Sequence, residues 1–275
     1  PGPVQQAPGS PSAGCYDASL NATHILNTYF VNMQYGSYSL TRQFVNTYLN
    51  RDGSRFTDKA GDEKTLFADE FENRDYRLMQ SIRYPGYTRR NNNVNTPYAP
   101  DFGYCVTGYQ PIKWVIDDTS MDSNTAPCAT SIPILRYAEV LLNYAEAVAE
   151  SNLPNAEGVI TAQEALNKVH HRAGFLDNLA LTSENVRRER KAEFALEYNT
   201  IWDYFRLREF HTIFDGTFRR RGLVPMLDFS GGEKKYIFVR AEVEPGNAQH
   251  KFEPKAYYRP IPGIGGNSLI NNPNY

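Results

Sequence analysis

The feature that most constrains the fold is an apolar stripe that recurs at spacings of three and four between residues 132 and 149. Apolar residues at these spacings line one side of an α-helix, which is buried when the protein folds. The members of the stripe are Leu135, Ala138, Leu142, Ala145 and Ala149. The pattern predicts a helix over Ile132–Ala149 and a largely helical core in this part of the chain.

A second helix is predicted directly after the first. Pro154 and Gly158 end the first helix. Thr161 followed by Glu164 has the spacing of a capping box, in which the two residues satisfy each other's backbone amides at the start of a helix. Gly174 ends this second helix. Because the connection is short, the two helices are expected to lie antiparallel.

A third helix is expected to begin near Thr182, with Ser183 and Glu184 as its start signal, and a fourth is expected over Thr200–Phe210. The third helix is predicted to turn four apolar residues inward, namely Val186, Ala192, Ala195 and Leu196. It is predicted to turn four basic residues outward, namely Arg187, Arg188, Arg190 and Lys191.

Outside these helices the chain is irregular, with long loops and a little β-structure near its C-terminal end. Tyr236–Arg240 alternates as a short strand does, and Ala256–Ile261 is a second β-like segment interrupted by prolines. Residues 1–14 hold little that could be buried and are expected to be a disordered lead-in. The expected organisation is a loop-rich region over 15–130, a helical region over 131–210 and an extended region over 211–275.

Charge, hydropathy and cysteine content exclude several classes of protein. The formal net charge is −2, with acidic and basic residues interleaved, which argues against nucleic acid as a partner. No stretch approaches the roughly 18 consecutive apolar residues that a membrane-spanning helix needs. Cys15, Cys105 and Cys128 are too few for a disulfide scaffold; one disulfide with a free thiol and three buried thiols are both compatible with them.

The sequence holds no motif that indicates catalysis, a bound metal or a cofactor. It has no His-Glu-x-x-His, Gly-x-Ser-x-Gly, phosphate-binding Gly-rich or Cys-x-x-Cys segment. His170 and His171 are adjacent on a predicted helix, so their side chains point about 100° apart and cannot both bind one metal ion. Asp117 and Asp118 are expected to form a solvated turn or a helix start, although paired carboxylates are also what glycoside hydrolysis requires. No enzyme activity is predicted.

Two long segments resemble the signature helices of the RagB/SusD family. Within residues 131–150, Arg136–Leu142 and Tyr144–Ala147 match the family's pattern Arg-Tyr-Ala-Glu-Val-Leu-Leu-x-Tyr-Ala-Glu-Ala. Within residues 185–210, the matching positions are Arg187, Arg188, Glu189, Arg190, Glu193, Glu197, Trp202, Asp203 and Arg206. Weaker matches to the family lie before and after these two segments, in the order in which the family has them. The resemblance therefore covers nearly everything from about residue 40 onward.

The resemblance implies a mainly α, SusD-like fold, to which the complete protein adds helix pairs of the TPR type. A complete member is roughly twice as long, so the chain is expected to be a C-terminal part. Family members lie on the cell surface of bacteria of the Bacteroidetes type, lipid-anchored to the outer membrane. There they bind oligosaccharides and lie over a SusC-type TonB-dependent transporter. The implied function is nutrient capture without chemistry, with the lipid anchor outside this chain.

Two alternatives keep the same fold but change the ligand. A relative that binds peptides would use the same loops, including the basic, Asn-rich stretch over 89–95. A TPR-like scaffold would bind other proteins and no small ligand. The sequence excludes neither the peptide-binding alternative nor the scaffold alternative.

Residue type and loop placement nominate the ligand contacts, because aromatic faces pack against sugar C–H groups and amides hydrogen-bond to hydroxyls. The family motifs do not identify these residues. The candidates are Tyr35, Tyr38, Tyr84, Tyr87, Asn91, Asn92 and Tyr104.

The charged residues of the signature segments are expected to be structural. On the first signature helix, residues three or four apart share one side, where each pair contributes only about 0.2 to 0.5 kcal/mol. These residues are Arg136, Glu139, Asn143 and Glu146. Their expected partners across helices are Arg187, Arg190 and Glu197.

Overall fold

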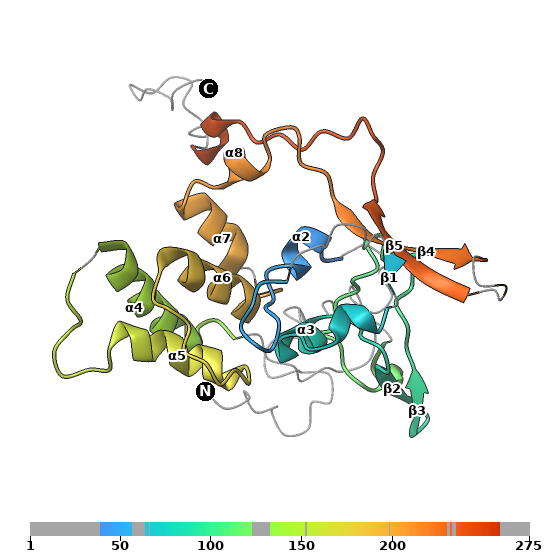
Figure 1. Ribbon diagram of the computed structural model, residues 1–275, viewed down its shortest axis with the longest axis horizontal. Helices are drawn as coiled ribbons and strands as arrows, with labels where there is room; N and C mark the ends of the chain where they lie inside the picture. The colour runs from blue at the N-terminus through green and yellow to red at the C-terminus, as the bar shows by residue number, and fades with distance from the viewer. Residues whose placement is uncertain are drawn as a thin grey trace, which may run out of the picture.

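The computed structural model describes residues 39–56, 64–65, 67–122, 133–151, 153–197, 199–229, 232 and 235–258. Helices are its main regular elements, with two small antiparallel sheets, so the predicted mainly α fold is confirmed (Figure 1). The helices are α2 (Arg42–Val45), α3 (Tyr76–Ser81), α4 (Tyr137–Ser151), α5 (Ala162–Arg172), α6 (Ser183–Glu193), α7 (Asn199–Arg206) and α8 (Phe210–Ile213). The strands are β1 (Lys64–Thr65), β2 (Thr88–Asn91), β3 (Val94–Pro97), β4 (Arg221–Asp228) and β5 (Lys235–Glu242). Short 3-10 helices are η2 (Asp69–Phe71), η3 (Thr119–Asp122) and η4 (Pro254–Tyr257).

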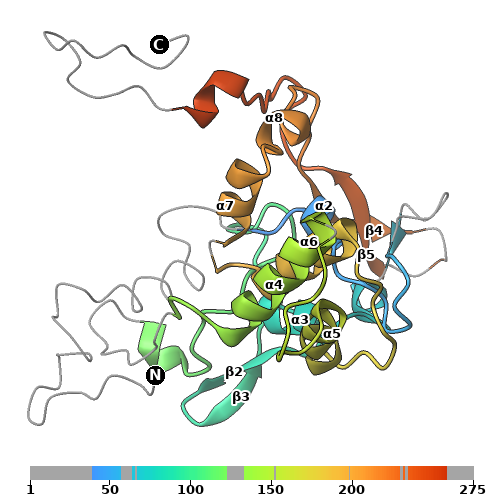
Figure 2. The same cartoon turned by 90° about the vertical axis from the view of Figure 1, so that its left-hand side faces the viewer.

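Helices α4, α5 and α6 form one hydrophobic core, and both ribbon views show them next to one another (Figures 1 and 2). The capping box predicted for α5 is present. The Glu164 N–H donates to Oγ1 of Thr161 at 3.1 Å, and the Thr161 N–H donates to the Glu164 carboxylate at 2.8 Å. The buried side chains between the helices include Leu141, Leu142, Ala145, Leu166, Val169, Val186 and Phe194.

Helix α4 begins later than its apolar pattern suggests. It starts at Tyr137, and Leu135 lies before it with 64% of its surface exposed. The predicted inward position of Leu135 is therefore wrong. The residues before α4 leave the helical path, and Arg136 reaches Glu193 at the end of α6 at 2.8 Å.

The larger sheet has the strand order β1-β5-β4, and all its pairs are antiparallel. Strand β5 confirms the prediction for Tyr236–Arg240. Strand β4 was not predicted, because a proline such as Pro225 usually argues against a strand. In addition, Met226 and Leu227 are both apolar and both exposed, so apolar and polar residues do not alternate there.

The smaller sheet is a hairpin of β2 and β3, where only a polar loop was expected. Asn92 and Asn93 connect the strands with φ of 48° and 63°, the left-handed conformation that a tight two-residue hairpin loop requires. Arg89 of β2 is buried and donates to Asp122 at 2.6 Å. This ion pair fixes the hairpin to the segment around η3.

The region after α6 differs from its prediction in two places. The single helix expected over Thr200–Phe210 is divided into α7 and α8, and Arg208 between them adopts a left-handed φ of 53°. The strand expected over Ala256–Ile261 is wrong for Ala256 and Tyr257, which belong to the 3-10 helix η4. Residues 259–261 lie outside the described residues.

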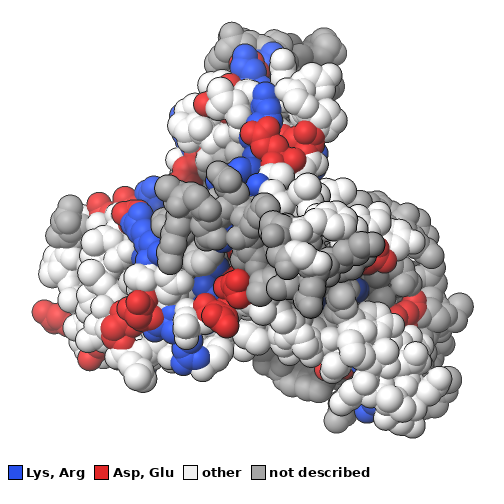
Figure 3. Space-filling model, turned by 45° about the vertical axis from the view of Figure 1, so that its right-hand side comes forward, with Lys and Arg blue, Asp and Glu red and all other residues white. Residues whose placement is uncertain are grey.

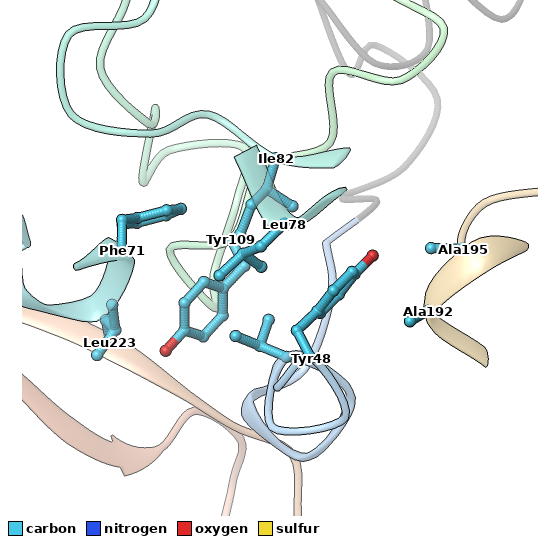
Figure 4. Packing of buried hydrophobic residues seen from close by; sticks show 9 residues of the cluster. Tyr48, Phe71, Leu78, Ile82, Tyr109, Ala192, Ala195 and Leu223 are labelled. Carbon is cyan, nitrogen blue, oxygen red and sulfur yellow. The ribbon is translucent and has the colours of Figure 1, made fainter. Parts of the chain in front are cut away.

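A second core joins α2, α3, the larger sheet and the end of α6. Figure 4 shows Tyr48 facing Ala192 and Ala195, with Tyr109 and Leu223 on its other side. Leu223 also donates its backbone N–H to the carbonyl of Thr107 at 2.8 Å. Strand β4 is thus docked onto the 105–108 turn by both packing and a hydrogen bond.

Gly222 tests this docking, because a Cβ at this position would lie 2.5 Å from the Cα of Thr107. We expect Gly222→Ala to lower the free energy of unfolding by about 2 kcal/mol, since backbone must move to relieve the overlap. Urea denaturation followed by circular dichroism measures it. Gly246→Ala is the matched control, because its Cβ would meet nothing within 4 Å. Equal stability of the two variants would contradict the docking.

Buried ion pairs connect the helices around Glu189 and Glu193 of α6. Arg77 of α3 donates to Glu189 at 2.8 Å and to Glu193 at 3.2 Å, and it also donates to Asp75 at 2.7 Å. Arg172 of α5 donates to Glu193 at 2.5 Å. These contacts tie α3, α5 and α6 into one charged network.

Arg190 of α6 also belongs to the buried side of its helix. It is 4% exposed and donates to Asp203 of α7 at 3.1 Å and to Asn143 of α4 at 2.6 Å. The expectation that Arg190 faces outward is wrong, because both partners lie on the inner side of α6. The expected pairing across helices is confirmed for Arg190, and for Arg136 with Glu197 at 2.7 Å.

The pH dependence of stability tests the network through Glu189. Burial alone raises the pKa of this carboxyl, but Arg77 and His170 outweigh it and lower the pKa to about 2. A carboxyl with a depressed folded-state pKa adds stability above its ordinary pKa of 4.5 and loses it as the pH falls through about 2. We expect Glu189→Gln to lower the free energy of unfolding at pH 7 by about 3 kcal/mol and to flatten its decline over that pH window.

Urea denaturation at a series of pH values measures both effects. Glu157→Gln, at an exposed carboxyl in the turn before α5, is the control and should change neither. A Glu189→Gln protein with the wild-type stability and pH profile would show that this carboxylate does not hold the helices together.

Candidate functional site

Two large cavities lie side by side along α2. The first, of about 840 Å³, is bounded by α2 and α6. The second, of about 650 Å³, is bounded by α2 and by residues around α8. They share Gln43, Thr47 and Lys191 and are together named the α2–α6 groove. Both volumes fall in the range of about 300 to 1,000 Å³ that is usual for sites of small ligands.

One wall of the α2–α6 groove is the α2 segment. Thr41 caps this helix by accepting a hydrogen bond from the Phe44 N–H at 3.3 Å. Residues three apart point into the core, namely Arg42, Val45 and Tyr48. The polar residues between them face the groove, namely Gln43, Asn46 and Thr47.

The opposite wall is α6, whose two faces have different roles. The inner face buries Val186, Glu189, Arg190 and Glu193. The groove face has the helical spacing i, i+3, i+4 and i+7 and consists of Glu184, Arg187, Arg188 and Lys191. The Arg-Arg-Glu-Arg motif is therefore divided, with its first two arginines in the groove and its last two residues in the core.

The groove has a basic end and an aromatic end. The basic end carries five cationic side chains, from Arg55, Arg187, Arg188, Lys191 and Arg221. The aromatic end is lined by the half-buried rings of Phe44, Tyr204, Phe214, Phe218 and His250. Flat apolar faces beside hydrogen-bonding groups suit a ligand that has both C–H faces and hydroxyls.

Ring contacts and one ion pair hold the aromatic end in place. The rings of Phe214 and Phe218 lie 5.0 Å apart, and those of Phe218 and His250 lie 5.8 Å apart. His250 Nε2 lies 2.8 Å from the carboxylate of Glu244. Burial alone raises the pKa of Glu244, but hydrogen bonds from Arg220 and His250 lower it to about 2, so the carboxylate stays charged.

The five ligand candidates that the structure describes lie outside this groove. Tyr84 and Tyr87 pack on each other with ring centroids 5.8 Å apart, and Tyr87 is buried. Asn91 and Asn92 are exposed at the end of the β2–β3 hairpin, and Tyr104 is exposed in a separate loop. Two further candidates, Tyr35 and Tyr38, lie outside the described residues. As ligand contacts, all seven stay predictions.

Sequence reasoning missed the groove residues, although part of their signal is visible. The basic positions of α6 recur at helical spacing, and Phe210, Phe214 and Phe218 recur every four residues. What the sequence does not show is that α2 stands opposite both sets, since it lies more than 130 residues earlier in the chain.

His170 has structural partners, and the face of the molecule drawn in Figure 3 carries charges of both signs. His170 is buried, stacks on Phe175 at 4.1 Å and lies 3.4 Å from Glu189. Within the described ranges, no group of three or more His, Cys, Asp or Glu could hold a metal ion. Figure 3 shows Lys and Arg next to Asp and Glu on the face that it draws, with uncharged surface between them.

Two further sequence features have structural counterparts. Cys105 is a buried free thiol, and Cys15 and Cys128 lie outside the described residues. No helix in the described part of the chain is long and apolar enough to cross a membrane.

The model of the SusD family matches residues 16–271. The chain belongs to the SusD family. Among solved structures, a SusD-like protein from Bacteroides fragilis matches this SusD-family chain at 20% identity and a TM-score of 0.67, covering 86% of this chain and 47% of that one. This match shows that the two share a fold.

Two other solved structures match less well. A SusD-like carbohydrate-binding protein from Bacteroides fragilis matches at 22% identity and a TM-score of 0.49, over 80% of this chain and 49% of that one. Surface glycan-binding protein A from Bacteroides thetaiotaomicron, in complex with laminarihexaose, matches at 22% identity and a TM-score of 0.45, over 74% and 39%. The SusD-family chain thus spans less than half the length of each of these three structures. No curated protein matches it.

Proposed function

We propose that this SusD-family chain binds oligosaccharides in the α2–α6 groove, as part of a protein that captures nutrients. The observation that carries the proposal is that an aromatic cavity and a polar, basic cavity adjoin each other and share Gln43, Thr47 and Lys191. Sugar C–H faces would pack on rings such as Phe218, and sugar hydroxyls would hydrogen-bond to Gln43, Asn46 and Thr47. Family membership supports the same ligand class.

The proposed role is binding without catalysis. The two carboxylates of the groove, Glu184 and Glu209, are both engaged by cations: Glu184 by Arg55, and Glu209 by Arg187 at 3.2 Å. A carboxyl that acts on a glycosidic bond must be free to contact the substrate oxygen, whereas each of these carboxylates is held by a cation of the groove itself. The groove is therefore suited to holding a glycan and not to cleaving it.

The proposal includes a place for the complete protein. A lipid-anchored position on the outer membrane, at the cell surface, would let the protein pass its glycan to a SusC-type TonB-dependent transporter. Family membership is what supports this part. Purification of the full-length protein with its transporter from native membranes would test it, and a glycan-binding protein found without any transporter would count against it.

Replacement of Phe218 tests the binding site. We expect Phe218→Ala to weaken binding of the oligosaccharide that a glycan array identifies by at least about tenfold, because the ring offers a face on which a sugar can pack. Isothermal titration calorimetry measures the affinity, and circular dichroism establishes that the variant is folded.

Two loop variants distinguish the groove from the sites nominated by the sequence. Tyr84→Ala and Tyr104→Ala should leave the affinity within about twofold of the wild-type value. Loss of binding in either, with none in Phe218→Ala, would place the glycan at the loops and contradict the groove. Binding to a peptide library but to no glycan would favour the peptide-binding alternative.

A further inference from the structure

The basic end of the α2–α6 groove holds more positive than negative charge. It is lined by five cationic side chains and by only two carboxylates, those of Glu184 and Glu209. Arg55 forms an ion pair with Glu184. Glu209 lies 3.2 Å from Arg187 and 3.5 Å from the ammonium of Lys191. Both carboxylates are therefore already paired within the protein.

Arg188 lines the groove but takes part in none of these ion pairs. Among the described residues, its guanidinium forms no ion pair, and its only hydrogen bond runs from Nη2 to the neutral amide oxygen of Asn185 at 2.5 Å. Burial and the nearby charge of Arg55 lower the pKa of Arg188, and the carboxylates of Glu184 and Glu189 offset this effect only in part. Arg188 lines the basic end of the groove from α6.

Buried polar atoms without a partner gather around the same cavity. In the described part of the chain, Arg187 Nε, Arg188 Nε and Asn46 Oδ1 are buried and make no hydrogen bond. All three residues line the basic end of the groove. They are three of the seven such side-chain atoms in that part of the chain. Because an unpartnered buried polar atom carries a free-energy penalty, a polar ligand at this place would be stabilised.

We propose that the basic end of the groove binds an acidic sugar, with Arg188 as the ionic contact for a uronate carboxylate or a sulfate ester. The inference rests on the proposed function, since the neutral part of the same oligosaccharide would lie along the aromatic end. A guanidinium presents several N–H donors in one plane, which match two oxygens of a carboxylate or sulfate. Acidic glycans are then the substrate class.

Glu184 is expected to oppose the binding of an acidic sugar, whereas Arg188 favours it. Its side chain is 68% exposed, lines the groove and holds Arg55 in an ion pair. An acidic sugar in the groove would be repelled by Glu184 and would compete with it for Arg55. Removal of this carboxylate should therefore strengthen the binding of acidic sugars.

Calorimetry with defined tetrasaccharides tests the proposal. The probes are tetragalacturonate, a chondroitin sulfate tetrasaccharide and neutral maltotetraose. We expect at least one acidic probe to bind about tenfold or more tightly than the neutral probe at about 50 mM NaCl, and the difference to shrink at about 500 mM. The two acidic probes distinguish a carboxylate from a sulfate as the preferred group.

Three variants assign the effect to the groove. Arg188→Gln should weaken binding of the acidic probe at least about tenfold more than it weakens binding of the neutral probe. Glu184→Gln should raise the affinity for the acidic probe. This test does not depend on whether the Arg188 variant folds. Lys168→Gln, which removes an exposed charge of α5 outside the groove, is the matched control and should change neither.

The outcomes separate this inference from the proposed function. The acidic preference would be overturned if acidic and neutral probes bound with equal affinity. It would also be overturned if neither Arg188→Gln nor Glu184→Gln changed the affinity for the acidic probe. Glycan binding in the groove would stand in both cases. Failure of every glycan to bind would overturn both.

Discussion

The structure depends on buried charges that meet at the inner face of α6. Glu193 accepts hydrogen bonds from Arg77, Arg136 and Arg172, at distances of 3.2, 2.8 and 2.5 Å. These arginines come from α3, from the residues before α4 and from α5, so one carboxylate fixes the relative positions of four helical segments. Burial of a charge costs several kcal/mol and is tolerated only where its partners are complete. An arrangement that left Glu193 without these partners would carry this cost, so the ion pairs favour the packing that is present.

The same network sets the geometry of the groove. Because Glu189 points to Arg77 in the core, the helical rotation of about 100° per residue turns Arg188 toward α2. The Arg-Arg-Glu-Arg motif thus couples structure and binding: its inner residues hold the helices, and its outer residues line the cavity. The structural role expected for this motif is confirmed for Glu189 and Arg190, whereas Arg188 makes no ion pair within the described residues and faces the groove.

Local patterns were enough to predict α4, α5 and α6. The capping box at Thr161 and Glu164 and the apolar period of α4 are contained in short stretches of sequence, and they are present in the structure. The predictions failed where distant residues decide. Arg136 pairs with Glu193 of α6 and lies outside the helix expected there, and α2 meets α6 across more than 130 residues. For that reason the sequence nominated loop tyrosines and missed the groove.

The most direct test of this account is a crystal structure of the protein with an oligosaccharide from the glycan array bound. The account predicts that the sugar lies in the α2–α6 groove, with a ring against Phe218 and, for an acidic glycan, its negatively charged group at Arg188. A glycan bound at the loops of Tyr84 or Tyr104, with the groove empty, would contradict it.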